Sequence, residues 1–594
     1  MAAPPGGPKK DLIAQWAFDT RPLLSRFHLW LEDVEVEWQG GASEGGFDRF
    51  TFVAGGLQRC LAMTAGVTAL GTRLFARFGA GKDADKQTLN EVKKDADAIS
   101  AYVMSEALWH FTRRLPENHA IMVCLGEGLM PKAGETPEMG ANPLLGFGRV
   151  YARPEVARFV DSRVRRLLND PGYGWSGFYK KMRDMGITIW GAAVDTLENT
   201  SRFAKGEEAG PLTVLHLFDQ PIVVTRPYEA YMGTLTIPRA VATVARDNSI
   251  HLDLLSPRKK LLEAIELTWP GIRREHVHVW TLGGKSRTTR LSGLWEEWRS
   301  LGVHLVEDGW RCPSGMAAFT ESGTYAPTYL VGSWTDAAGA RQVFLCDGYA
   351  ATAEALQAAS LAEALDVEVS MALFTPHFDL PIERERRVAR LDPEAPEFAS
   401  RLGALFGKEL DPGLVDEYRV CLREMVVANV PVGKPVIHAD DFFPEKEWRV
   451  LAAAGYMGPD PYTGLPGVTQ VGDSSWQVTT QLAARGAGCK VSFVFRFLES
   501  FEQTRLVFSP LLERFVAGED YRKRPVKISD SGRIRNELQT LCSPALEYAD
   551  SKIHVHFDRI DDLVIRAEKK QKIRQVLEWY RENHPVWFSW LEIA

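Results

Sequence analysis

The chain has 594 residues, of which 45% are hydrophobic and 25% are charged, a composition typical of folded globular proteins. At roughly 150 residues per domain, this length predicts about three or four domains. The net charge of -7 argues against a general nucleic-acid binder, because neutralising phosphates usually requires a basic surface.

Cysteine usage and hydropathy indicate the compartment. The seven cysteines form no CxxC pair and no short regular spacing, which fits reduced thiols better than a disulfide framework or a structural zinc site. The N-terminal sequence MAAPPGGPKKD lacks the apolar core of a secretory signal, and no run of about twenty apolar residues is present that could span a bilayer. We therefore expect a cytoplasmic protein that does not enter a membrane.

Hydrophobic periodicity divides the chain into five regions. Residues 1–10 form a Pro/Gly-rich tail that we expect to be disordered, and residues 11–118 carry helical periodicity, for example in LLSRFHLWLEDV. Residues 119–270 and 271–380 alternate short apolar runs with amphipathic segments, which predicts two α/β domains. Residues 381–594 are predicted to be a mixed α+β region. The alternation predicts an α/β fold whose sheet is mostly parallel and built from Rossmann-like βαβ units.

The segment from His276 to Glu307 is the clearest predicted βαβ unit. HVHVWTL is typical of a strand, GGKSRTTR of a turn, LSGLWEEWRSLG of an amphipathic helix and VHLVE of a second strand. Because a helix N-terminus presents unpaired N–H groups and a partial positive charge, this turn is a predicted site for a phosphate or carboxylate. The alternative is an ordinary exposed connection. The candidate residues are Gly283, Gly284, Lys285, Ser286, Arg287, Thr288, Thr289 and Arg290.

This turn does not complete a known phosphate-binding motif. A P-loop, GxxxxGK[ST], would require glycine where the chain has Val279. A strand that ends in a Ser/Thr-rich turn opening a helix resembles a half-site of phosphosugar isomerases. The likeness covers only this unit and lacks a full motif, so it does not assign the chain to that family.

Two carboxylates follow apolar runs and are candidate catalytic residues. Glu127 lies between two glycines at the end of the run IMVCLG, where a carboxylate could act as a base or accept a hydroxyl group from a ligand. Asp347 follows the run VFLC and precedes a predicted helix, where it could orient a substrate. The alternatives are a solvent-facing glutamate in a turn and an aspartate that caps a helix.

Histidines and acidic residues suggest a metal only weakly. His438 and Asp440, with further acidic residues up to Glu447, could coordinate a divalent ion, but a helix start at Pro444 explains the same residues more simply. His554 and His556, like His276 and His278, would share one face of a strand. No complete motif indicates a cofactor.

These features predict a cytosolic enzyme that acts on a phosphorylated or carboxylated small metabolite. Sugar-phosphate isomerisation or group transfer requires only an anion-binding turn and acid/base residues, here Glu127 as base and Asp347 orienting the substrate. We also expect a homo-oligomer. One alternative is a non-catalytic, self-assembling scaffold protein. A weaker one is a metal-dependent hydrolase or lyase that uses His438 with Asp440 or the pair His554 and His556.

Overall fold

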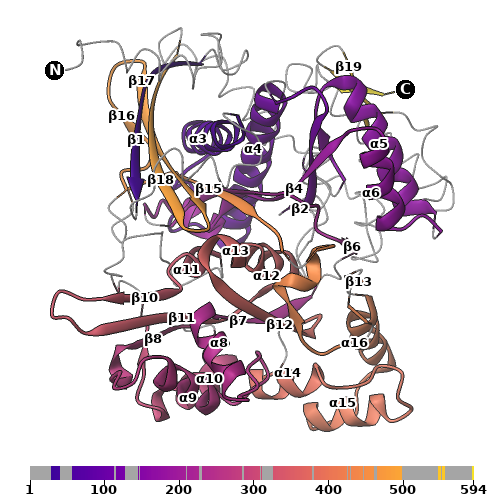
Figure 1. The fold of residues 1–594 in the computed structure, drawn as a ribbon, viewed down its shortest axis with the longest axis vertical. Coiled ribbons are helices and arrows are strands. Elements are labelled where there is room, and N and C mark those ends of the chain that lie inside the picture. Colours follow the sequence, from indigo (N-terminus) through magenta and orange to yellow (C-terminus); the bar gives the residue numbers. More distant parts are fainter. Residues whose placement is uncertain are drawn as a thin grey trace.

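The computed structural model describes the chain in segments. These are residues 29–39, 56–112, 115–126, 145, 148–170, 172–208, 210–226, 230–283, 287–307, 310, 325–377, 380–424, 426–427, 430–431, 433–445, 447–459, 465–497, 546–549, 552–555 and 591–593. Two large β-sheets dominate, with helices between them and on their outer sides (Figure 1).

The first sheet has nine strands in the order β1-β18-β17-β15-β5-β4-β2-β3, with β16 paired to β17. Its strands are β1 (Leu29–Gln39), β2 (His119–Gly126), β3 (Val150–Tyr151), β4 (Thr188–Glu198), β5 (Leu212–Phe218), β15 (Val450–Tyr456), β16 (Thr469–Gln470), β17 (Ser475–Ala484) and β18 (Ala487–Phe497). Early and late parts of the chain therefore share one sheet. Whether the predicted regions 119–270, 271–380 and 381–594 fold independently stays a prediction.

The second sheet has seven strands in the order β14-β12-β7-β11-β8-β9, with β10 paired to β11. Its strands are β7 (Tyr231–Pro238), β8 (Val277–Trp280), β9 (His304–Leu305), β10 (Gly332–Thr335), β11 (Arg341–Ala351), β12 (Val367–Thr375) and β14 (Ile437–His438). Two small sheets join β6 (Val224–Arg226) to β13 (Val426–Val427), and β19 (Leu546–Ala549) to β20 (Lys552–Val555) and β21 (Leu591–Ile593).

Helices form layers on both sides of each large sheet (Figure 1). The helices are α3 (Leu57–Phe75), α4 (Lys86–Thr112), α5 (Pro154–Asn169), α6 (Trp175–Asp184), α7 (Thr200–Lys205), α8 (Arg239–Asp247), α9 (Arg258–Thr268), α10 (Thr288–Ser300), α11 (Tyr325–Thr328), α12 (Thr352–Ala359), α13 (Ala362–Leu365), α14 (Ile382–Val388), α15 (Phe398–Phe406) and α16 (Pro412–Glu424), with the 3-10 turns η2 (Arg274–His276) and η4 (Ala439–Phe442). Helices α3 and α4 cover the first sheet, α12 and α13 lie between the sheets, and α8, α9 and α10 lie on the outer side of the second sheet.

Close packing fixes these layers. The core under α3 joins its buried Leu61 and Leu70 to Leu215 of β5 and Phe493 of β18. Helix α3 approaches β15 so closely that a Cβ atom on Gly455 would lie 2.5 Å from the backbone oxygen of Ala65. A glycine at this position is therefore what permits the helix and the strand to touch.

The prediction of a mostly parallel, Rossmann-like sheet is wrong. Among the described strands of the two large sheets, only β2–β4, β8–β9 and β8–β11 pair in parallel. The other ladders there are antiparallel. Long apolar strands such as β5 are typical of parallel sheets covered on both faces, but helices also cover both faces of this mixed sheet. The six-residue helix α7 is too short to cross the sheet, so β5 returns antiparallel to β4.

The predicted helical N-terminal region is only partly helical. Residues 57–75 and 86–112 form α3 and α4 as expected, but residues 29–39 form β1 rather than a helix. Acidic residues alternate there with Val34, Val36 and Trp38, which is a strand pattern.

Other predicted elements have mixed outcomes. The apolar runs on either side of DAAG predict a hairpin, which β10 and β11 confirm. The sequence also predicts a single helix from about Thr352 to Leu365, which the structure divides into α12 and α13. A closing helix, predicted from about residue 562 to residue 583, lies outside the described residues. No helix within the described segments is long and apolar enough to cross a membrane.

Candidate anion-binding turn and the charge network behind it

The predicted strand–helix–strand unit is present. Strand β8 is connected through residues 281–287, where the sequence predicts a turn, to α10, which leads to β9, and β8 and β9 are parallel. Strand β11 is parallel to β8 on its other side, with Cys346 opposite Trp280. The turn therefore lies at the carboxyl ends of parallel strands, where open α/β sheets commonly bind ligands.

The described part of the turn leaves polar groups at the start of α10. Thr288 and Thr289 are exposed in its first turn, and that turn contains no acidic residue. The side chain of the N-cap residue Arg287 does not cap the helix. Gly283 is half-buried just before the turn, while Gly284, Lys285 and Ser286 lie outside the described residues.

Arg290, the last candidate of the turn, points into the protein. Its guanidinium forms a salt bridge with Glu385 of α14, and its Nη2 donates to the Tyr349 hydroxyl of β11 at 2.9 Å. Burial, followed by the charge of Glu385, raises the pKa of Tyr349, so this hydroxyl keeps its proton. These contacts fix the first turn of α10 against the sheet. The role of Arg290 in anion binding stays a prediction.

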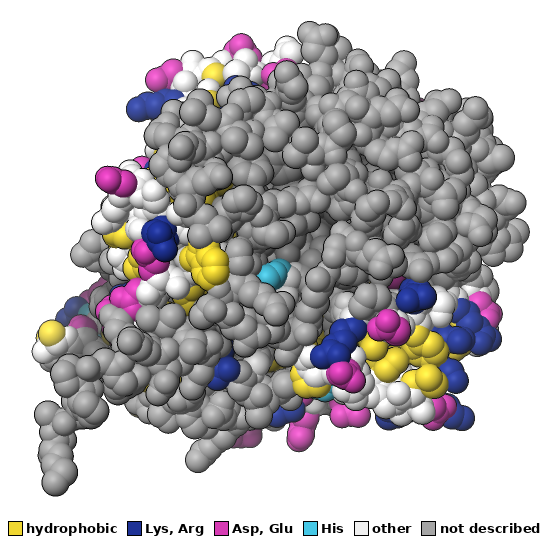
Figure 2. Space-filling model, turned by 90° about the horizontal axis from the view of Figure 1, so that it is seen from above, with side chains coloured by type: hydrophobic (Ala, Val, Ile, Leu, Met, Phe, Trp, Pro, Cys, Tyr) yellow, Lys and Arg dark blue, Asp and Glu magenta, His cyan; other side chains and the backbone are white. Residues whose placement is uncertain are grey.

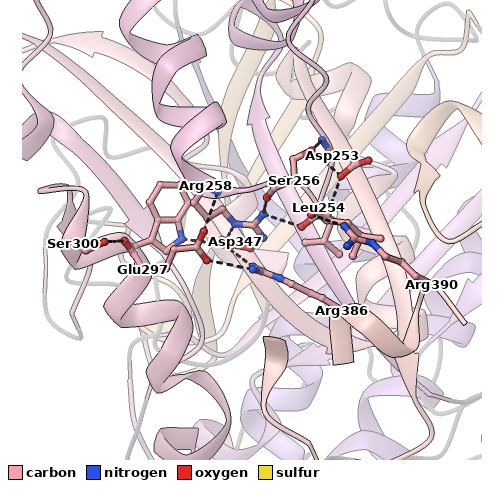
Figure 3. Close-up of polar contacts among 11 residues, drawn as sticks. Asp253, Leu254, Ser256, Arg258, Glu297, Ser300, Asp347, Arg386 and Arg390 are labelled. Carbon is pink, nitrogen blue, oxygen red and sulfur yellow. Dashed lines mark hydrogen bonds and ion pairs between the residues drawn. The ribbon is translucent and has the colours of Figure 1, made fainter. Parts of the chain in front are cut away.

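Asp347 lies at the centre of a buried charge network (Figure 3). Its Oδ2 accepts from Arg258 Nε at 2.6 Å and from Trp298 Nε1 at 2.9 Å, and its Oδ1 accepts from Arg258 Nη2 at 2.8 Å. Arg386 Nη2 is 3.7 Å away. Burial alone would raise the pKa of Asp347, but the two arginines and the hydrogen bonds together lower it, so the carboxylate is ionised.

This network fastens three helices to the second sheet. Glu297 of α10 accepts a hydrogen bond from the backbone N–H of Arg258 at 3.0 Å and pairs with Arg386 of α14 at 3.4 Å. Arg258 Nη1 also donates to the backbone oxygens of Leu254 and Ser256 (Figure 3). Asp347 is thus a structural anchor in this conformation. That Asp347 orients a substrate stays a prediction. In that role, a ligand would have to displace one of the hydrogen-bond donors that now contact its carboxylate.

The other candidate residues are dispersed. Glu127 lies outside the described residues, directly after β2 of the first sheet. Asp441, next to the metal candidate Asp440, accepts from the backbone N–H of His438 at 2.9 Å and from Lys434 Nζ at 3.0 Å. Asp440 accepts instead from Trp448 Nε1 at 3.3 Å.

No metal site is assembled from the residues that the structure describes. These residues contain no group of three or more His, Cys, Asp or Glu side chains that could hold a metal ion. The helix expected at Pro444 is replaced by the 3-10 turn η4, which begins earlier and which Asp441 caps. His554 belongs to β20, and His556 lies outside the described residues.

The sequence did not reveal two features of this region. Arg258 follows Pro257 in an exposed-looking basic run, and nothing in that run marks one cation as completely buried. The HxH pair was expected on one strand, but His276 lies in η2, and His278 instead faces His304 of the parallel neighbour β9. The predicted βαβ unit could have indicated the pair of His278 and His304, because it makes their two strands parallel neighbours.

Surface charge and similarity add little to the site. On the face shown in Figure 2, basic and acidic side chains are interspersed among the described residues. No known family model matches the chain, and no curated protein is significantly similar to it.

Proposed function

We propose that this protein binds a small metabolite through its phosphate or carboxylate group at the turn between β8 and α10. The observation that supports this most is the parallel arrangement of β9, β8 and β11, which puts the turn at the carboxyl edge of these strands. The strand–helix–strand unit predicted from the sequence agrees with the described fold at this corner of the second sheet.

The chemistry of the turn suits an anion. The N–H groups and hydroxyls of Thr288 and Thr289 are hydrogen-bond donors near the positive end of α10, and Arg287 adds a cation. Lys285 and Ser286 would complete the donor set. The contacts of Arg290 with Glu385 and Tyr349 hold the helix start in place, so less order has to be imposed when the anion binds.

Catalysis is the second part of this proposal. Sugar-phosphate isomerisation or group transfer would take its base from Glu127 and its substrate orientation from Asp347. The buried network around Asp347 would have to open for that role, so binding and catalysis are separable in experiment.

Location and assembly belong to the same proposal. The five described cysteines, Cys60, Cys124, Cys346, Cys421 and Cys489, are free and buried. Free thiols are typical of a reducing compartment, which supports the cytoplasm. Self-association into a homo-oligomer is the remaining part of the proposal, and light scattering of the purified protein measures it.

Binding can be tested with two arginines on one helix. Arg287 begins α10 and the exposed Arg299 lies in its last turn, so Arg299→Ala is a matched control for Arg287→Ala. Thermal shift and calorimetry with sugar phosphates, nucleotides and carboxylic acids should detect one ligand class. For that class, Arg287→Ala and Lys285→Ala should each weaken affinity about tenfold, which corresponds to roughly 1.4 kcal/mol. Unchanged affinity in both variants, or an equal loss in Arg299→Ala, would rule out the turn.

A further inference from the structure

Two histidines on neighbouring strands of the second sheet share a hydrogen bond. His278 of β8 and His304 of β9 face each other in the parallel ladder, and their Nδ1 atoms are 2.7 Å apart. His278 Nε2 lies 2.9 Å from Gln342 Oε1, and Gln342 Nε2 donates to Asp336 Oδ2 at 2.8 Å. Side chains from three strands and one hairpin turn therefore form a single chain of hydrogen bonds.

The donors and acceptors follow from the Asp336 end of this chain. Hydrogen bonding from the backbone N–H of Ala340 is the largest effect on the pKa of Asp336 and lowers it, so the carboxylate is ionised and only accepts. Gln342 accordingly turns its N–H group to Asp336 and its oxygen to His278. That oxygen requires a donor, so His278 carries its proton on Nε2, and its Nδ1 accepts from His304 Nδ1–H.

The histidine pair can take up one additional proton and keep this hydrogen bond, but it cannot take up two. His304 can gain a proton on Nε2 and still donate from Nδ1. When both rings are protonated, two N–H groups face each other at 2.7 Å and two positive charges adjoin, so the bond cannot persist. Burial lowers the pKa of His278 to about 4 and also lowers that of His304, so the pair is neutral at ordinary pH.

Burial is the largest effect on the pKa of both rings, and His278 is the more deeply buried of the two. The charged neighbours act in the same direction. His276 lowers the pKa of His278, whereas Glu307 raises that of His304. Protonation of His304 therefore comes first and that of His278 last. Around the pair, η2 and the residue before it carry Arg273, Arg274, Glu275 and His276, Glu307 follows β9, and the β10–β11 hairpin carries Asp336 and Arg341. Cys346, Asp347 and Tyr349 lie further along β11.

The shared bond lies at a short edge of the second sheet. Strand β9 has two residues and lies at the end of the strand order, and Val306 adds one backbone bond to Val279 at 2.9 Å. The Trp310 ring covers the pair, with its centroid 4.9 Å from that of His278 and 5.9 Å from that of His304.

We propose that the pair His278 and His304 is an acid-sensitive latch, whose double protonation breaks the shared hydrogen bond and releases β9 and Trp310 from the second sheet. This device does not depend on the anion-binding turn, because its hydrogen bonds join His278, His304, Gln342 and Asp336, which lie outside that turn.

Amide hydrogen exchange measured by mass spectrometry tests the latch. The peptide that contains Leu305 and Val306 should lose about tenfold in protection between about pH 7.5 and about pH 4.5, after correction for intrinsic exchange. The central strand β7 should keep its protection. In His304→Gln the amide can still donate to His278 Nδ1 but cannot be charged, so the loss at low pH should disappear. The exposed His251→Gln is the matched control and should behave like the wild type.

Two results would overturn the latch. One is equal protection of the β9 peptide at both pH values in the wild type. The other is an identical loss in His304→Gln. If the whole protein unfolds first, the midpoint of acid unfolding replaces exchange as the measurement. It should move to lower pH in His304→Gln, and an unchanged midpoint counts against the proposal.

Discussion

Two arginine–carboxylate clusters attach the second sheet to its surroundings, one in the core and one in water. In the core cluster, the side chains of Arg258 and Asp347 are 1% and 0% exposed. The outer cluster joins the start of α8, the end of α13 and the turn between β17 and β18. Its members are Arg239, Glu363, Asp366 and Arg485.

The two clusters have hydrogen bonds of similar length but differ in their exposure to solvent. Arg485 donates to Glu363 at 2.7 Å, about as short as the bonds within the core cluster, yet its side chain is 50% exposed. Water can replace any partner lost from the outer cluster. In the core, a lost partner leaves a charge that water cannot reach, so equal geometry predicts very unequal losses of stability.

Removing the central carboxylate should have the largest effect. Asp347→Ala leaves Arg258 and Arg386 buried without their shared partner, and we expect a loss of about 3 to 5 kcal/mol in the free energy of unfolding. Urea unfolding of the purified protein measures it. Asp366→Ala removes a carboxylate from the outer cluster and is the matched control, so equal losses would contradict the comparison.

A double variant separates the charge from the packing. Arg258→Met combined with Asp347→Leu removes both members of the buried pair and should be less destabilising than Asp347→Ala alone. A double variant that is as unstable as the sum of the two single variants would show that the pair does not act as a unit.

A buried, neutral histidine extends the comparison between core and surface to the pH dependence of stability. His216 of β5 is completely buried, and because the Ser360 hydroxyl donates to the oxygen of Gln357, His216 Nδ1 donates to Ser360 at 2.8 Å. Burial lowers the pKa of His216 from its ordinary value to about 3. The unfolded chain therefore takes up this proton first, and stability falls as the pH drops below about 6.5.

The expected size of this effect is about 3 kcal/mol between about pH 6.5 and about pH 4. Urea unfolding at several pH values should show a smaller decline in His216→Gln than in the wild type. The exposed His251→Gln should not change the slope. Parallel declines in all three proteins would indicate that His216 is not the titrating group.

The sequence predicted local units better than their assembly. The turn and helix after His278 were predictable because apolar periodicity and glycines mark them within thirty residues or so. The direction of β5 was not, because it depends on how the short α7 folds back and not on the apolar pattern of the strand itself. The alternating pattern of β1 was available but was overridden by the helical pattern that precedes and follows it.

The candidate site was predictable only in part. The sequence pattern put Asp347 at a strand end or helix entrance, whereas it lies inside β11, and its partners Arg258, Trp298 and Arg386 come from three helices. A sequence pattern does not indicate which of many arginines will be buried, since that choice depends on tertiary packing. The roles of Glu127 as a base and of Lys285 in anion binding stay predictions, because both residues lie outside the described segments.

The smallest expected effect concerns the outer cluster. Arg485→Ala should cost less than about 1 kcal/mol, because its partners Glu363 and Asp366 are partly exposed and keep Arg239. Raising the salt concentration should shrink even this loss by screening the cluster, whereas the loss in Asp347→Ala should hardly change because salt cannot enter the core. Urea unfolding at low and high salt measures both. A large, salt-insensitive loss in Arg485→Ala would mean that the junction between the sheets excludes water as well as the core does, and the contrast between the clusters would fail.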